Sequence, residues 1–197
     1  TGLCDFDKKV EAARNQEYKE AMELMQVLGV LTEDVEYDPN ALVSRQDLAL
    51  YIAKLLGVEA TEVESRYFVD VPSSGYATWA INYLTEAGIF STNQDKMFYP
   101  KENADINQVC KVLTSVLGYS RYAENAGGYP MGYIEASNLA ELDIQEFQNV
   151  TFENLMILLY RTARANLYSV LSAGGGTVTM EKEDETLLSR YYDMYEG

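Results

Sequence analysis

Three segments of the chain share one pattern of apolar and polar positions. In each segment a short polar residue is followed by apolar side chains that recur at steps of three and four residues, a spacing that gives a helix one apolar face. The segments are residues 44–56, 105–117 and 151–163. The pattern predicts three one-sided helices.

The ends of these predicted helices carry suitable capping residues. A side-chain oxygen at the opening position can accept a free backbone N–H of the first turn, and a polar residue three positions later can return a bond in a capping box. The opening residues are Ser44, Asp105 and Thr151, and the residues three positions later are Asp47, Gln108 and Asn154. Gln108 suits the capping box best, because the other two side chains are shorter. Gly57 and Gly118 predict left-handed caps after the first two helices.

A second amphipathic segment precedes each capped helix. These segments end at Gly29, Gly88 and Glu141. A glycine would be expected at the last of these positions as well. In the first two copies, Pro39 and Pro100 then restrict the preceding residue to extended backbone, which predicts a short strand-like arm before the capped helix. The chain therefore contains a helix–loop–helix unit in three copies.

The second copy resembles the S-layer homology (SLH) repeat. The resemblance rests on Phe68-Val69-Asp70-Val71-Pro72, Ala80-Ile81-Asn82-Tyr83-Leu84, Gly88-Ile89, Phe98 and Pro100. It implies SLH repeats at residues 10–57, 67–118 and 129–165, the third one divergent, and a tail or the start of a linker to a further domain at residues 166–197. It also implies a mainly all-α fold, in which three helix–loop–helix repeats form a pseudo-threefold bundle with short extended loop segments.

For function, the resemblance implies a non-catalytic module that attaches a longer exported protein to the bacterial surface. The expected partner is secondary cell-wall polysaccharide, typically carrying acidic pyruvyl groups, and the expected location is secreted, at the cell wall. The alternative is a degenerate SLH scaffold that serves protein–protein contact, or acts as a structural stalk, without binding glycan.

The family's binding signature is a tetrad similar to Thr-Arg-Ala-Glu at the start of the capped helix, with a Trp earlier in the repeat. The arginine of the tetrad falls on Arg45, whereas Ile106 and Phe152 stand at its place in the other two copies. An arginine offers a planar fork of donors that pairs with a carboxylate, and neither replacement can do this. The Trp position aligns with Tyr76, three residues before Trp79. The resemblance thus implies a glycan site formed by Arg45, Ser44, Asp47, Tyr76 and Trp79.

Two of these assignments have open alternatives. Arg45 could instead form a salt bridge with Asp47 or a nearby glutamate. Trp79 could belong to the core or to the wall of a groove, as a single Trp next to apolar helix positions often does.

Residues after Leu171 change in character. The glycine-rich stretch 172–176 predicts a flexible joint. Residues 177–180 predict a short strand, and the mixture of acidic and apolar residues from 181 to 195 predicts a last helix. The loop at residues 91–95 lacks the spacing of a calcium loop, and we interpret it as an ordinary turn.

Composition narrows the function. The 197 residues include 15 basic and 31 acidic side chains, for a net charge of −16, which argues against nucleic acid and against an anionic membrane surface. The sequence has no histidine, so histidine-based triads and metal sites are excluded. We expect no catalytic residues, no metal, no cofactor and no membrane insertion. Because so acidic a chain repels an acidic polymer, binding needs a local cation, for which Arg45 is the candidate.

The two cysteines and the first residue allow two further predictions. Cys4 and Cys110 lack the spacing of a metal or redox pair, and Cys110, within an apolar helical run, is expected to be a buried free thiol. The chain begins at Thr1 without an initiator Met, which predicts a mature or trimmed form.

Overall fold

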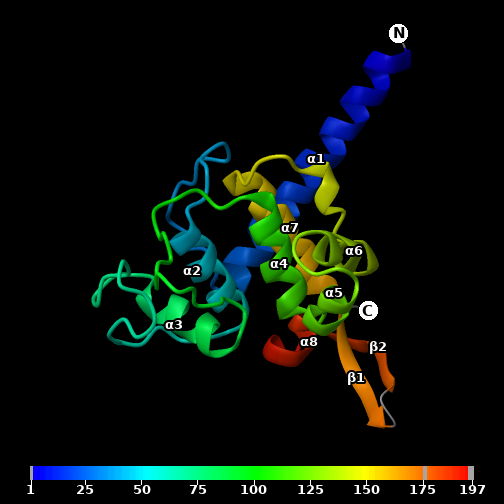
Figure 1. Cartoon of the computed structure of the whole chain (residues 1–197). Helices are drawn as coiled ribbons and strands as arrows, with labels where there is room; N and C mark the ends of the chain where they lie inside the picture. The colour runs from blue at the N-terminus through cyan, green and yellow to red at the C-terminus, as the bar shows by residue number, and fades with distance from the viewer. Residues whose placement is uncertain (1, 175–176, 195–197) are drawn as a thin grey trace.

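The structure, a computed structural model, describes residues 2–174 and 177–194 (Figure 1). It is mainly helical, as predicted. The helices are α1 (Gly2–Val27), α2 (Arg45–Leu55), α3 (Thr78–Glu86), α4 (Ile106–Val116), α5 (Ser120–Asn125), α6 (Met131–Leu139), α7 (Phe152–Arg164) and α8 (Leu187–Tyr192), with a 3-10 turn η1 (Ile144–Glu146). Two antiparallel strands, β1 (Asn166–Gly174) and β2 (Thr177–Thr186), form a hairpin.

The predicted starts of α2, α4 and α7 are confirmed. The side chains of Ser44, Asp105 and Thr151 each accept the backbone N–H three residues later. At the start of α4 the side chain of Gln108 also accepts the N–H of Asp105 at 3.1 Å, which completes a capping box. The left-handed caps are confirmed as well, with φ of +70° at Gly57 and +96° at Gly118.

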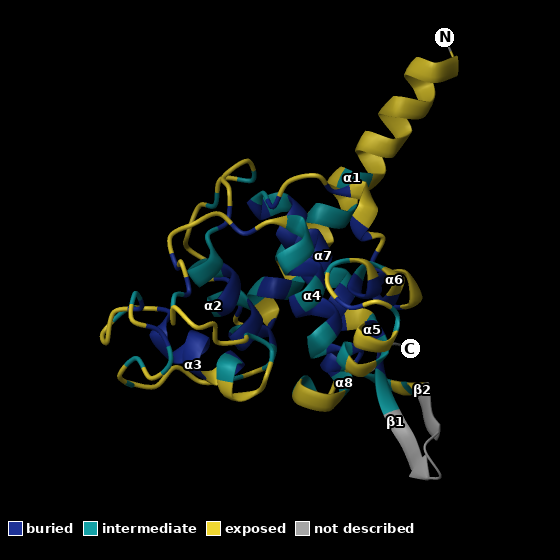
Figure 2. Ribbon diagram, viewed as in Figure 1, coloured by how far each residue is buried: buried dark blue, intermediate teal, exposed yellow. Residues whose placement is uncertain are grey.

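The core lies where α2, α4 and α7 bury their apolar faces. Leu48, Leu113 and Leu155 are among the fully buried side chains of one contiguous cluster. The second half of α1 joins this core and packs along α7, whereas its first turns project away from the body and are exposed (Figures 1 and 2). Among the described residues, no helix has the length and apolar character needed to cross a membrane.

Cys110 lies inside this core on α4. It is a free cysteine, as predicted, and its thiol donates to the carbonyl oxygen of Tyr133 at 3.2 Å. Burial raises the pKa of the Cys110 thiol to about 11, so the reactive thiolate is scarce at neutral pH.

The first turns of α2 and α7 each form hydrogen bonds with the extended arm that precedes another capped helix. The N–H groups of Arg45 and Gln46 donate to the carbonyl oxygens of Glu102 and Pro100, at 2.8 and 2.9 Å. In the same way, those of Phe152 and Glu153 donate to Ala41 and Pro39, at 2.8 and 3.0 Å. Two further bonds, Ala104 N–H to Val43 O and Val43 N–H to Val150 O, complete the two sets. The donors and acceptors occupy matching positions relative to the N-caps. We call this contact between a helix start and the arm of another repeat a junction, and it occurs twice in the same form.

The tail differs from its prediction. Residues 172–174 belong to β1 rather than to a flexible joint, and residues 175–176 lie outside the described ones. The strand predicted at 177–180 is present but continues to Thr186, so among the described residues the expected helix is confined to Leu187–Tyr192, and residue 195 lies outside them. Glu181, Lys182 and Thr186 pair with β1 across an irregularity in the register, and local sequence pattern does not report such cross-strand contacts.

The hairpin and α8 are attached to the helical body. Tyr168 of β1 donates its N–H to Leu117 O at 2.8 Å and stacks on Tyr119, with ring centroids 4.3 Å apart. Gly118 makes this approach possible, because a Cβ there would lie 2.1 Å from the carbonyl oxygen of Tyr168. The hydroxyl of Tyr192 donates to carbonyl oxygens of Lys54 and Leu55 at the end of α2.

Left-handed residues follow α1, α3 and α6, with φ of +75° at Gly29, +76° at Gly88 and +58° at Glu141. For a residue with a Cβ this conformation costs about 1–2 kcal/mol. Replacing such a residue with glycine removes this cost, although glycine also makes the unfolded chain more flexible, which cancels part of the stabilisation.

We therefore expect Glu141→Gly to raise the free energy of unfolding by about 0.5–1 kcal/mol, measured by urea denaturation. The matched change Gly88→Ala, at a position with open space for a Cβ, should lower it by about 1 kcal/mol. Equal signs for the two variants would contradict this account.

Candidate functional site

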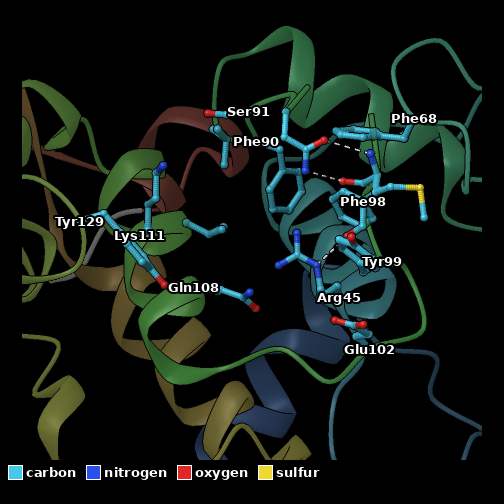
Figure 3. A pocket seen from close by; sticks show the side chains of 14 residues that line it. Arg45, Phe68, Phe90, Ser91, Phe98, Tyr99, Glu102, Gln108, Lys111 and Tyr129 are labelled. Carbon is cyan, nitrogen blue, oxygen red and sulfur yellow. Dashed lines mark hydrogen bonds between the residues drawn. The ribbon is translucent and has the colours of Figure 1, made fainter. Parts of the chain in front are cut away.

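A pocket of about 360 Å³ lies between the start of α2 and one face of α4 (Figure 3). Arg45, the first residue of α2, forms one wall together with Phe98 and Tyr99 of the arm that precedes α4. Lys111 of α4 and Tyr129, just before α6, form the opposite wall. The remaining lining residues are Phe68, Ile89, Phe90, Ser91, Asn93, Met97, Glu102, Gln108 and Val112.

The arm beside Arg45 determines how its guanidinium is held. The Nε–H donates to the carbonyl oxygen of Phe98 at 2.8 Å, and the guanidinium carbon lies 4.8 Å from the centroid of the Phe98 ring. The two terminal nitrogens have no hydrogen bond or ion pair to any described residue, and they point into the pocket in Figure 3. A salt bridge to Asp47 or a glutamate, the alternative for Arg45, is therefore not formed among the described residues.

Asp70, within the motif at residues 68–72, fixes this arm. Its two carboxylate oxygens accept the N–H groups of Phe98 and Tyr99, at 2.8 and 2.7 Å. Phe68 and Phe90 pack around Phe98, each with its ring centroid 5.1 Å away. The carbonyl oxygen that orients Arg45 is thus itself held by a charged acceptor and two aromatic neighbours.

Burial lowers the pKa of Arg45, and the carboxylates of Asp105, Glu102 and Asp70 act against that shift. An arginine nevertheless keeps its charge at any physiological pH. A half-buried cation without a paired carboxylate carries an uncompensated desolvation cost. An anionic group entering the pocket would find unused N–H donors and offset that cost.

The opposite wall was not predicted from the sequence. The ammonium of Lys111 lies 5.8 Å from the ring centroid of Tyr129 and 5.5 Å from that of Tyr133, within the range of a cation–π contact. Tyr129 precedes α6 by the same two positions by which Tyr76 precedes α3. This correspondence was the available signal for Tyr129.

Tyr76 and Trp79 do not line the Arg45 pocket. They line a different one, of about 660 Å³, together with residues 60–64 and 73–75. Trp79 is only 8% exposed and donates its Nε1–H to Tyr76 O at 3.1 Å, which fits the alternative of a core or groove-wall residue. The hydroxyl of Tyr76 donates to Asp47 at 2.5 Å. Residues two apart on a helix face different ways, so Tyr76 lies beside Asp47 and lines a different pocket from Arg45.

Ser44, too, has a structural role. Its hydroxyl accepts the N–H of Asp47 at 3.2 Å as the N-cap of α2, and it does not line the Arg45 pocket. Of the five residues expected to form the site, Arg45 therefore lies in the pocket, and the other four surround the first turn of α2 or the pocket at Trp79.

At the matching position of α7, Phe152 replaces the arginine and stacks on Tyr37, with centroids 4.9 Å apart and rings parallel to within 1°. The pocket there measures about 180 Å³. Ile106 of α4 borders another pocket, of about 340 Å³. Neither pocket has a lysine or arginine among the described residues that line it. The part of the chain described here also holds no group of three or more Cys, Asp or Glu placed to bind a metal ion.

The role of Asp70 can be tested by stability. Removing its carboxylate in Asp70→Ala leaves two backbone N–H groups without their charged acceptor, and we expect the free energy of unfolding to fall by about 2–3 kcal/mol, measured by urea denaturation. Asp34→Ala removes an exposed aspartate with no hydrogen bond among the described residues and should change it by less than about 0.5 kcal/mol. Similar losses for both variants would show that Asp70 does not fix the arm.

The chain is similar to known proteins in the segment that contains Asp70 and Phe98. The family model of the S-layer homology domain matches residues 67–105. A relative, a cellulosome-anchoring protein of Acetivibrio thermocellus, is 34% identical over 70 residues, which cover 34% of this chain and 16% of that protein. The family-model match includes Asp70 and the arm at Phe98 and Tyr99 beside Arg45, whereas Arg45 and Lys111 themselves lie outside it. Residues 67–105 are therefore similar to the S-layer homology domain, and the chain spans a small part of the anchoring protein that it matches.

Proposed function

We propose that the chain is a non-catalytic anchoring module that binds acidic secondary cell-wall polysaccharide in the Arg45 pocket and tethers a longer exported protein to the bacterial surface. The S-layer homology domain and the anchoring relative support surface attachment in general. The pocket supports the more specific proposal of an acidic glycan ligand, including a polymer with pyruvyl groups.

The observation that carries the proposal is the state of Arg45. In a chain with 31 acidic and 15 basic side chains, an arginine would readily find a carboxylate, yet the terminal nitrogens of Arg45 have no partner among the described residues. The guanidinium is held by Phe98 in a fixed orientation with its donor face toward a cavity. Such a preorganised fork suits a planar carboxylate on a ligand.

Aromatic side chains at the pocket suit the rest of a sugar. Tyr99 and Tyr129 line it and are 43% and 50% exposed. Exposed tyrosines offer an apolar face and a hydroxyl to a pyranose ring. In this proposal Arg45 binds the acidic group and a tyrosine contacts the ring that carries it.

We also infer that three SLH repeats form a pseudo-threefold arrangement. Support comes from the three side-chain caps, the three left-handed residues that follow α1, α3 and α6, and the two matching junctions. At the third junction, Ile106 and Asn107 lack the corresponding backbone partners among the described residues, and the pocket at Ile106 lies there.

A degenerate scaffold without glycan binding is the second candidate function. It is favoured by one observation, the replacement of the arginine by Phe152, whose stack on Tyr37 occupies the matching place at another junction. Under this alternative Arg45 would serve only to hold Phe98, and the chain would act through protein contacts or as a stalk.

Calorimetric titration with purified wall polysaccharide separates the two. We expect one site per chain, and we expect Arg45→Gln to weaken binding about tenfold or more, because a bidentate charged contact is lost. Arg121→Gln removes an equal charge from an exposed arginine of α5 outside the pocket and should leave binding unchanged. Polysaccharide stripped of its acidic groups should bind as weakly to the native chain as the intact polymer does to Arg45→Gln.

Absence of binding by the native chain would overturn the anchoring proposal in favour of the scaffold. Equal binding by the native chain and Arg45→Gln would remove the Arg45 pocket as the site. Urea denaturation of both variants verifies that each remains folded.

A further inference from the structure

The three arms are joined by a series of backbone hydrogen bonds that stops before it closes into a ring. The residues that precede the three N-caps are Val43, Ala104 and Val150. Ala104 donates its N–H to Val43 O at 2.9 Å, and Val43 donates its N–H to Val150 O at 3.0 Å. The bond that would close the ring, from Val150 N–H to Ala104 O, is absent, and neither group has another partner among the described residues. We call the gap between the start of α4 and residues 148–150 the open junction.

A pocket of about 340 Å³ lies in the open junction. On one wall, the N–H groups of Ile106 and Asn107 have no partner in the described part of the chain, although the equivalent groups of α2 and α7 each donate to an arm. On the other wall, the N–H groups of Gln148 and Asn149 have no partner within residues 2–174 and 177–194. Backbone groups on both walls are therefore available to a ligand that enters between them.

The arm that precedes α7 is held away from this gap. Five residues before the N-cap, the two closed junctions have Pro39 and Pro100, whose carbonyl oxygens accept N–H groups of a helix start. Glu146 stands at that place before α7, where it ends the 3-10 turn η1 and forms a salt bridge with Arg161 at 3.3 Å. Arg161 also donates to Leu142 O at 2.9 Å. This arm therefore begins as a turn, which explains why it does not extend along the first turn of α4.

The two closed junctions indicate which chemistry fits the open one. In both, the free N–H groups of a helix start are met by an extended peptide, through carbonyl oxygens three and five residues before an N-cap. An extended peptide presents backbone donors and acceptors along its length, so it can bond to an exposed backbone edge as an added strand does. Carboxamide side chains, which both donate and accept, also border the pocket and suit a peptide backbone. They are Asn103, Asn107, Gln148 and Asn149.

Charge restricts the kind of peptide. The N-terminus of a helix attracts negative groups, but the carboxylate of Asp105 already occupies this place as the N-cap of α4. Asp105 lines the pocket, whereas no lysine or arginine among the described residues does. The chain as a whole has a net charge of −16. An acidic peptide is therefore repelled, and a neutral or basic one is favoured.

We propose that the open junction binds an extended, non-acidic peptide of a partner protein, as the closed junctions bind arms of this chain. Two carbonyl oxygens of the peptide accept from Ile106 and Asn107, and one of its N–H groups donates to Ala104 O. An apolar side chain of the peptide contacts Leu42, which lines the pocket and is 55% exposed. The proposal does not rest on the glycan site, because the pockets at Arg45 and Ile106 share no lining residue.

Peptides with the sequences of the two arms serve as probes, with both ends blocked. The peptide of residues 97–104 has one lysine and one glutamate, and the peptide of residues 36–43 has one glutamate and one aspartate. We expect the first to bind with a Kd of about 1 mM, to shift the amide signals of Ile106 and Asn107 in the isotope-labelled chain, and to slow their hydrogen exchange. The second, which is acidic, should bind more weakly. N-methylation of the last residue of the first peptide removes the N–H that donates to Ala104 O and should weaken binding about threefold or more.

A proline variant removes one donor of the protein while keeping α4. Proline is favoured at the first position of a helix, and Asp105 already has the extended backbone that proline requires of the residue before it, with φ of −98° and ψ of 163°. We expect Ile106→Pro to weaken binding of the 97–104 peptide about three- to tenfold. The matched control Ile106→Ala also shortens the side chain but keeps the N–H, and it should bind more tightly than Ile106→Pro. Urea denaturation verifies that both variants are folded.

Three results would overturn the proposal. The first is the absence of any shift at Ile106 and Asn107 with the 97–104 peptide, including the case in which N-acetylglucosamine shifts these signals instead. The second is slow hydrogen exchange of both amides in the free chain, which would show that the chain's own arm closes the junction. The third is equal binding by Ile106→Pro and Ile106→Ala. Arg45→Gln should bind the peptide as the native chain does, so a failure of glycan binding at Arg45 is distinguished from a failure here.

Discussion

The first turn of an α-helix has backbone N–H groups with no partner inside the helix, and much of this structure follows from how they are satisfied. In α2 and α7 the N-cap side chain takes one of them, and the arm of a neighbouring unit takes the two before it. A helix start therefore cannot move without the arm that its N–H groups contact. This dependence joins segments that are far apart in the chain, and it places the side chain of Arg45 next to the Phe98 arm.

The Arg45 pocket is an extension of the same junction. Backbone bonds from Arg45 and Gln46 align the arm with α2, Asp70 holds the arm from its other side, and Phe98 then orients the guanidinium through its carbonyl oxygen and its ring. Each contact in this series is made by a residue whose own position is fixed by another. The result is a cation whose donors are oriented before any ligand arrives, so that little ordering cost remains at binding.

Local chemistry in the sequence was sufficient to predict the helix starts at Ser44, Asp105 and Thr151, because a cap depends on residues within one turn. It also identified position 141 as one that favours glycine. It did not reveal the hairpin, since the acidic residues of β2 adopt a strand only by pairing with β1. It did not predict which aromatic residues line the Arg45 pocket. Tyr76, which the resemblance grouped with Arg45, lines another pocket, whereas Tyr129, the residue before Pro130, lines this one.

The stack of Phe152 on Tyr37 bears on how long such a module would stay on a surface. A chain with several equivalent pockets rebinds through one while another is released, which raises its avidity far above the affinity of a single pocket. The junction at Phe152 has an aromatic contact at the position that Arg45 occupies in the other junction, so among the described residues this junction offers no second arginine pocket. Residence at the wall would then be set by the dissociation rate of one pocket, and lasting attachment would depend on how many chains an assembly displays side by side.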